Sequence, residues 1–180
     1  TIFLGILPSE WMVERSGTGS LAFWNFIYNL FAPFMFLSLA VTLHSGGVKS
    51  GARLLTALIV GLALDLLITL ATPTRGPLFI HPEWFSKGIK TSSEVLAGFL
   101  DFSVRHYAEH PGSVFACGGI SAMPSYHVFA WTCGLFCWRK TSRPIIYGVV
   151  LLWVLNWMST VVLGWHYALD GLAGVVLAAG

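Results

Sequence analysis

Two histidines stand in short polar blocks that could together transfer a phosphate group. The first block is Pro124-Ser125-Tyr126-His127, and the second runs from Ser159 through His166 to Asp170. An aspartate four residues after a histidine can hold the imidazole in one tautomer, which leaves the other ring nitrogen free to attack. A second histidine can donate a proton to the leaving oxygen. The blocks therefore predict His166 as nucleophile, Asp170 as its orienting partner and His127 as general acid.

The first block also has the features of an anion site. Pro124 favours a helix start, where the free N–H groups and the positive end of the helix dipole attract phosphate. The hydroxyl of Ser125 adds a donor at the same place. The block by itself is more often an ordinary helix start, and a lone His-x3-Asp is more often a helix-end pair. The combination of the two blocks is what favours catalysis.

Composition predicts the class of protein that carries these blocks. Hydrophobic residues make up 56% of the 180 residues and charged residues 10%, whereas a soluble domain has about 25% charged residues. The mean hydropathy is +0.74. The net charge of +2 is scattered, and no basic run would follow a nucleic acid backbone. We therefore expect an integral membrane protein that contacts lipids and does not bind nucleic acid.

The apolar runs predict an all-α, polytopic transmembrane helical bundle of about five to six membrane helices, since a crossing needs about 20 apolar residues. The last run is still apolar at Gly180, so we expect one domain over residues 1–180 whose final helix continues in a longer chain. The five runs are Leu21–Leu43, Leu54–Thr72, Ser125–Trp138, Pro144–Gly164 and Tyr167–Gly180.

Basic residues predict the orientation of the bundle. The connections His44–Arg53 and Arg139–Arg143 hold most of the lysines and arginines near the runs, so both should face the cytoplasm. The long segment 73–124 then lies on the opposite side, together with both histidine blocks. Within it, Thr91–Glu109 has the pattern of a short amphipathic helix. This helix is expected to be either a lid over the site or a packed cap without substrate contact.

At these residues the chain resembles the type-2 phosphatidic acid phosphatase family, which shares its site with vanadium haloperoxidases. Pro124-Ser125-Tyr126-His127 is similar to the family's Pro-Ser-x-His motif, and Ser159, His166 and Asp170 match the spacing of its third motif. The resemblance covers roughly residues 54–180, in the helix order of the last four of six membrane helices. It implies that His166 forms a phosphohistidine, and that Ser125 and Ser159 bind the substrate phosphate.

The chain departs from the family's pattern at its cations. Ile68 occupies the position of a lysine, Arg75 is followed by glycine instead of proline, and Thr160 follows Ser159 where an arginine is usual. Arg75, at the end of an apolar run, is therefore the best remaining cation for phosphate. Met-Pro-Ser-x-His, with Ser-Thr before His-Tyr-x-x-Asp, resembles the inositol phosphorylceramide synthase-like branch. That branch transfers a phospho-head group between lipids, so hydrolysis and transfer both stay open.

The sequence thus predicts a lipid-phosphate phosphatase or phosphotransferase at the non-cytoplasmic membrane face. No carboxylate cluster suits magnesium or zinc, so we expect a metal-independent reaction without a cofactor. The alternative is a catalytically decayed, structural membrane subunit of a larger complex, and association with other membrane proteins is open in either case. Asp65 lies within an apolar run, where it is either functional or paired with a polar group such as Asn156.

Overall fold

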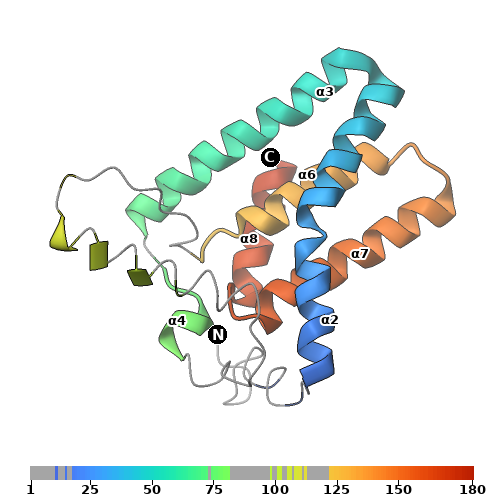
Figure 1. Cartoon of the computed structure of the whole chain (residues 1–180). Coiled ribbons are helices and arrows are strands. Elements are labelled where there is room, and N and C mark those ends of the chain that lie inside the picture. Colours follow the sequence, from blue (N-terminus) through green and yellow to red (C-terminus); the bar gives the residue numbers. More distant parts are fainter. Residues whose placement is uncertain are drawn as a thin grey trace.

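The structure is a computed structural model that describes residues 11, 15, 18–72, 74–81, 98, 101–102, 105–106, 108–110, 112 and 122–180. In this part of the chain every regular element is a helix, which confirms the all-α fold class (Figure 1). The main helices are α2 (Thr18–Asn29), α3 (Phe31–Ala71), α4 (Pro77–Ile80), α6 (Tyr126–Trp138), α7 (Arg143–Val162) and α8 (Ala168–Ala179).

Helix α6 is the centre of the bundle. It packs against α3, α7 and α8, while α2 packs mainly against α7 (Figure 1). Residues 128–134 of α6 are buried without interruption, and a helix that is apolar all round is typical of such a central position. The apolar run predicted at Ser125–Trp138 is therefore confirmed as a helix, and its first turn carries His127.

The first two predicted runs are divided differently from the expectation. Leu21–Leu43 is not one helix, because α2 ends at Asn29 and α3 begins at Phe31. Pro33 explains the break, since its ring cannot donate to the carbonyl of Asn29 and collides with it. The connection His44–Arg53 is not a loop either: α3 continues through it, and only Gly47 leaves helical geometry, with φ 67° and ψ −175°. The two arms of α3 meet at this kink (Figure 1).

The outer surface of the bundle is apolar. Phe36 is 75% exposed and Leu70 is 79% exposed, which is costly in water and favourable in lipid. Among the described residues, Ser20–Ala71 and Arg143–Val162 are long and apolar enough to cross a membrane, and Ala168–Ala179 is a shorter apolar helix. The chain is accordingly a helical membrane protein, and the number of crossings stays a prediction.

Polar side chains inside the bundle join its helices. The indole N–H of Trp138 donates to the hydroxyl of Ser38 at 2.9 Å, and that of Trp153 donates to Thr132 at 3.1 Å. Such hydrogen bonds stabilise helix contacts where no water is available. The amide of Asn156 donates to the carbonyl of Ile27 at 2.9 Å. The predicted pairing of Asn156 with Asp65 is therefore wrong, because Asn156 faces α2.

The two basic connections lie at the same end of the bundle. Arg53 of α3 and Arg139 and Lys140 after α6 line one cavity of about 420 Å³, beside the kink of α3. The C-terminal end of α6 lies there, whereas His127 belongs to its first turn. The positive charges and the histidine blocks thus occupy opposite ends, as the charge pattern predicted, and the assignment of the basic end to the cytoplasm stays a prediction.

Candidate active site

His166 lies in the tight turn between α7 and α8. Gly164 has φ 78°, which is the left-handed region that glycine adopts without strain. The backbone N–H groups of Trp165 and His166 both donate to the carbonyl of Thr160, at 3.0 and 3.2 Å. Because α8 begins only at Ala168, His166 precedes the helix. Its position is set by hydrogen bonds back to the last turn of α7.

The imidazole of His166 is fixed by a backbone carbonyl. Nδ1 lies 2.6 Å from the oxygen of Ala122, and a carbonyl oxygen can only accept, so Nδ1 carries the proton. The lone pair of the neutral ring is then on Nε2. Burial lowers the pKa of His166 from 6.5 to about 4, although the hydrogen bond to Ala122 opposes this shift. At neutral pH the ring is therefore uncharged and has the electron pair that a nucleophile needs.

Asp170 stands close to His166 but does not make its shortest contact. The carboxylate oxygen Oδ2 is 3.9 Å from Nδ1 of His166 and accepts a hydrogen bond from the backbone N–H of Tyr167 at 2.7 Å. The expected proximity of the two side chains is confirmed. The carboxylate fixes the residue that follows His166 and places a negative charge beside the imidazole, while the carbonyl of Ala122 sets the tautomer.

His127 is half-buried and packs against aromatic rings from α2 and α3. Its imidazole stacks on Tyr28 with ring centroids 4.5 Å apart and on Phe31 at 4.1 Å. Tyr28 also stacks on Trp165, the neighbour of His166, at 6.3 Å. The two imidazoles are close enough to interact electrostatically. The fold therefore brings both histidines into one cluster, as expected, although they are separated by most of α6 and α7 in the chain.

The two serines predicted to bind phosphate both contact the backbone. Ser125 is fully buried and its Oγ accepts from the N–H of Val128 at 3.3 Å, so that it caps α6. Its own N–H donates to the carbonyl of Asp170 at 2.9 Å, which ties the starts of α6 and α8 together. Ser159 is equally buried, and its hydroxyl donates to the carbonyl of Asn156 at 2.5 Å. Direct phosphate contact by either hydroxyl stays a prediction.

Arg75 belongs to a segment that is pinned against the His166 turn. The N–H of Leu78 donates to the carbonyl of Gly164 at 2.9 Å, and Thr74 accepts from the N–H groups of both Ala122 and Met123 at 3.0 Å. The side chain of Arg75 is exposed and has no ion pair within the described part of the chain. Its charge is therefore available for a ligand beside this turn.

Gly76 allows this close approach, and its replacement by alanine is expected to disturb the site. An added Cβ would overlap the carbonyl of Trp165 and come within 2.8 Å of that of Gly164, both of which are backbone atoms. We expect overpacking to cost about 1–3 kcal/mol of stability and displacement of His166 to lower turnover by roughly 10²-fold. Thermal unfolding and turnover measure the two effects. Gly148→Ala is the control, because a Cβ there meets only open space.

Most of the predicted lid, Thr91–Glu109, lies outside the described residues. The described positions in this stretch are helical, and Arg105 pairs with Asp101 at 2.7 Å across one turn. Nδ1 of His110 donates to the carbonyl of His106, one turn before it, at 3.3 Å. These contacts are local to the segment. Whether it covers the site or packs without touching substrate stays a prediction.

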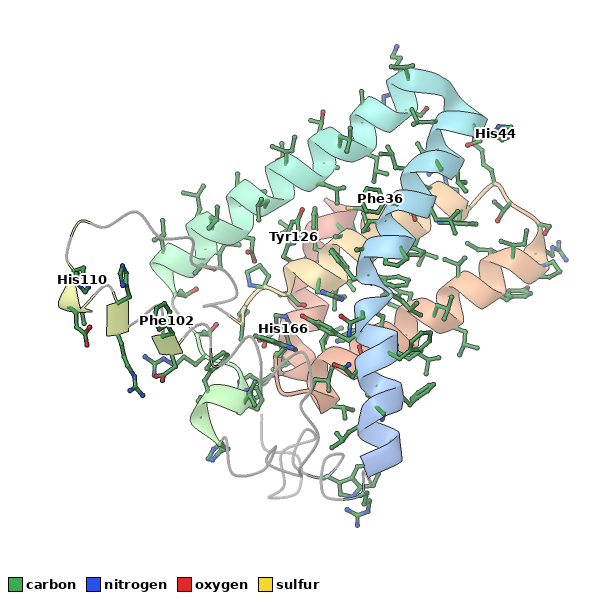
Figure 2. All side chains as sticks on the ribbon, viewed as in Figure 1. Phe36, His44, Phe102, His110, Tyr126 and His166 are labelled. Atoms are coloured by element: carbon green, nitrogen blue, oxygen red, sulfur yellow. The ribbon has the colours of Figure 1, made fainter. Side chains whose placement is uncertain are left out.

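Sequence reasoning missed the residues that surround the two histidines. Figure 2 shows His166 in the middle of the molecule and His44 at the end where α3 kinks. The neighbours Tyr28 and Phe31 come from α2 and the start of α3, outside the motif-bearing part of the chain. No sequence signal marks the carbonyl of Ala122, because every residue has one. The amide of Asn156 was visible as a polar residue in an apolar run, but its neighbours were not.

Comparison with known proteins places the chain in a family. Residues 4–180 match the family model described as the PAP2 superfamily, which covers nearly the whole sequence. No curated protein and no solved structure matches the chain. The match supports a phosphatase-type function and confirms the expected superfamily. It does not extend to the inositol phosphorylceramide synthase-like branch, so that assignment stays a prediction.

Proposed function

Because the chain belongs to the PAP2 superfamily, we propose that it is a membrane enzyme that takes the phosphate group from a lipid phosphate through a phosphohistidine at His166. The site faces the non-cytoplasmic side, opposite the basic connections of the bundle. The apolar outer surface allows a lipid substrate to reach the turn between α7 and α8 without leaving the membrane.

The observation that carries this proposal is the state of the His166 imidazole. Its Nδ1 donates to the carbonyl of Ala122 at 2.6 Å, and its side chain is 12% exposed beside the carboxylate of Asp170. The free lone pair of Nε2 is thereby held in one direction by a rigid backbone group. A merely structural histidine needs no such arrangement beside a second histidine.

The first chemical step breaks the bond between phosphorus and the lipid oxygen. Nε2 of His166 attacks phosphorus in line, and His127 gives a proton to the leaving oxygen. The positive charge that develops on the imidazole is stabilised by Asp170, 3.9 Å away. Arg75 and the free N–H groups at the start of α6 stabilise the phosphoryl oxygens. In this mechanism Arg75 and the backbone N–H groups stabilise the phosphate without the two further cations that the family usually has. Ile68 and Thr160 occupy the positions of those cations in this chain.

The second step releases the phosphate from His166. A water molecule or a lipid hydroxyl attacks phosphorus, His127 accepts the proton of that hydroxyl, and the bond between phosphorus and Nε2 breaks. Water as acceptor gives inorganic phosphate, and a lipid alcohol gives a new phospholipid. Both outcomes use the same residues, so the acceptor decides between phosphatase and transferase activity.

The test is release of phosphate from a panel of lipid phosphates by the purified protein in detergent, with EDTA present and with or without a lipid alcohol. We expect metal-independent turnover, inhibited by vanadate, which imitates the pentacoordinate phosphate bound to His166. Phosphate release identifies a hydrolase, and appearance of the label in a second lipid identifies a transferase. Absence of both products and of vanadate binding would contradict the proposal and favour the structural subunit.

A further inference from the structure

The proton donor proposed above has no catalytic partner of its own. His127 is held by stacking on Tyr28 and Phe31, which restricts the plane of the ring but not the position of its proton. Within the described residues, Nε2 of His127 is buried and has no hydrogen-bond partner. A buried imidazole nitrogen without a partner is costly, and it leaves the tautomer undetermined.

Asn156 presents the complementary group. Its side chain is 1% exposed in the middle of α7, and its Nδ2 donates to the carbonyl of Ile27 at 2.9 Å. Because the amide nitrogen is used in this way, the orientation of the amide is fixed. Its Oδ1 is buried and has no partner among the described residues. The bundle therefore buries one unpaired acceptor whose direction is set by a bond to α2.

The two unpaired atoms belong to neighbouring side chains. The amide of Asn156 interacts with the imidazole of His127, and Ile27, which holds Asn156, precedes the Tyr28 that stacks on His127. One atom can carry a proton and the other can only accept one. A hydrogen bond between them would satisfy both.

We propose that Asn156 is a positioning residue for His127, in which Oδ1 of the amide accepts the proton of Nε2. This inference rests on the proposed function. With Nε2 protonated in every step, the proton that moves must be the one on Nδ1. In the first step the ring is protonated on both nitrogens and passes the Nδ1 proton to the leaving oxygen, which leaves a neutral ring with its proton on Nε2. In the second step Nδ1 takes the proton of the attacking hydroxyl and the ring is cationic again. The amide accepts the hydrogen bond but is not protonated itself, so the Nε2 proton stays on the ring.

The dependence of kcat/KM on the leaving group of the substrate distinguishes a positioning role of Asn156 from a structural one. An alkyl phosphate needs a proton on its leaving oxygen, whereas 4-nitrophenyl phosphate does not, because nitrophenolate is a stable anion. We expect Asn156→Leu, which has a similar volume, to lower kcat/KM for the alkyl lipid phosphate by about 10- to 100-fold, which is less than the roughly 10²- to 10⁴-fold contribution of a general acid because His127 itself is still present. The value for 4-nitrophenyl phosphate should change less than about threefold. An equal loss on both substrates, or no loss on the alkyl phosphate, overturns the proposal.

Two further variants are controls for a general loss of packing in Asn156→Leu. Asn156→Asp keeps an oxygen toward His127 but loses the donor to Ile27, so the difference between the two substrates should return toward that of the unmodified protein. Thr132→Val removes another buried hydrogen bond between α6 and α7, the one with Trp153. It should affect both substrates alike. A selective loss in Thr132→Val, or a leaving-group dependence in Asn156→Asp equal to that of Asn156→Leu, would count against Asn156.

The proton on His127 can also be observed without turnover. In ¹⁵N-histidine spectra of the micelle-bound protein, with His127→Gln used for assignment, we expect the neutral ring to carry its proton on Nε2. The Asn156→Leu spectrum should show a mixture of tautomers. An unmodified protein that hydrolyses neither substrate would contradict the proposed function, and the spectra would still decide the role of Asn156. If the neutral His127 ring of the unmodified protein carries its proton on Nδ1, the proposed role of Asn156 is overturned.

Discussion

Replacement of His166 by alanine is expected to lower the rate of phosphoryl transfer by roughly 10⁴-fold or more, because the nucleophile and its covalent intermediate are both lost. The remaining rate should come from Arg75, the helix N-terminus and substrate binding alone. Turnover of the lipid phosphate that the unmodified protein uses best is the measurement. Brief incubation with ³²P-labelled substrate adds a direct readout, since phosphohistidine should be trapped in the unmodified protein and absent from the variant.

The alanine variant also leaves the buried carbonyl of Ala122 without its donor, which costs about 1–3 kcal/mol of stability. His166→Asn is the matched variant, because the amide nitrogen of asparagine takes the place of Nδ1 and can still donate to that carbonyl, but cannot form a stable phosphoryl bond. We expect it to unfold near the temperature of the unmodified protein and to be as inactive as His166→Ala. His44→Ala, at the opposite end of the bundle, should retain full activity (Figure 2). Retained activity in His166→Asn would exclude His166 as nucleophile.

Local sequence signals were sufficient for the starts of α6 and α7. Pro124 and Ser125 predicted the start of α6, and the structure has Ser125 as its cap. Arg143 and Pro144 begin α7. In these cases the residues that start a helix act on the backbone next to them, so the physical cause is contained in a few neighbouring positions.

The first half of the chain was harder to predict because Pro33 and Gly47 have effects there that their neighbouring residues do not indicate. Pro33 interrupts an apolar run that reads as one crossing, and the helix ends four residues earlier, at Asn29. Gly47 sits in a stretch rich in glycine and charge that reads as a loop, yet only this one residue leaves helical geometry. Packing of both arms of α3 against α6 favours helix on either side of the kink. Such packing cannot be predicted from the local sequence.

In the candidate active site, too, the contacts that orient the side chains could not be predicted from the sequence. The spacing of His166 and Asp170 correctly predicted that the two side chains lie close together. The expected reason, that both lie on one helix, is wrong, because α8 begins only after His166. The group that fixes the imidazole is the carbonyl of Ala122, 44 residues earlier. The segments that contain Leu78 and Gly164 are joined by a hydrogen bond between backbone atoms. Sequence identifies the side chains that do chemistry, whereas their orientation depends on backbone groups that every residue shares.

His127 has two opposite tasks in the proposed reaction, and its removal should separate them. We expect His127→Phe, which keeps an aromatic ring against Tyr28 and Phe31, to lower turnover of an alkyl lipid phosphate by about 10²- to 10⁴-fold. With 4-nitrophenyl phosphate the leaving group needs no proton, so the phosphohistidine should still form. Its hydrolysis lacks the base that activates water and should become the slow step.

The expected signature is a burst of about one nitrophenolate per protein chain, followed by a slow steady state in which phosphohistidine accumulates. Rapid-mixing absorbance measures the burst, and acid-labile, alkali-stable ³²P on His166 measures the intermediate. The unmodified protein is the control, and it should show a smaller accumulation because both steps are catalysed. A steady state without accumulated intermediate, at the rate of the unmodified protein, would contradict the dual role. Accumulation with 4-nitrophenyl phosphate would assign the proton transfer of the second step to His127, and slow turnover of the alkyl lipid phosphate would assign that of the first step to it.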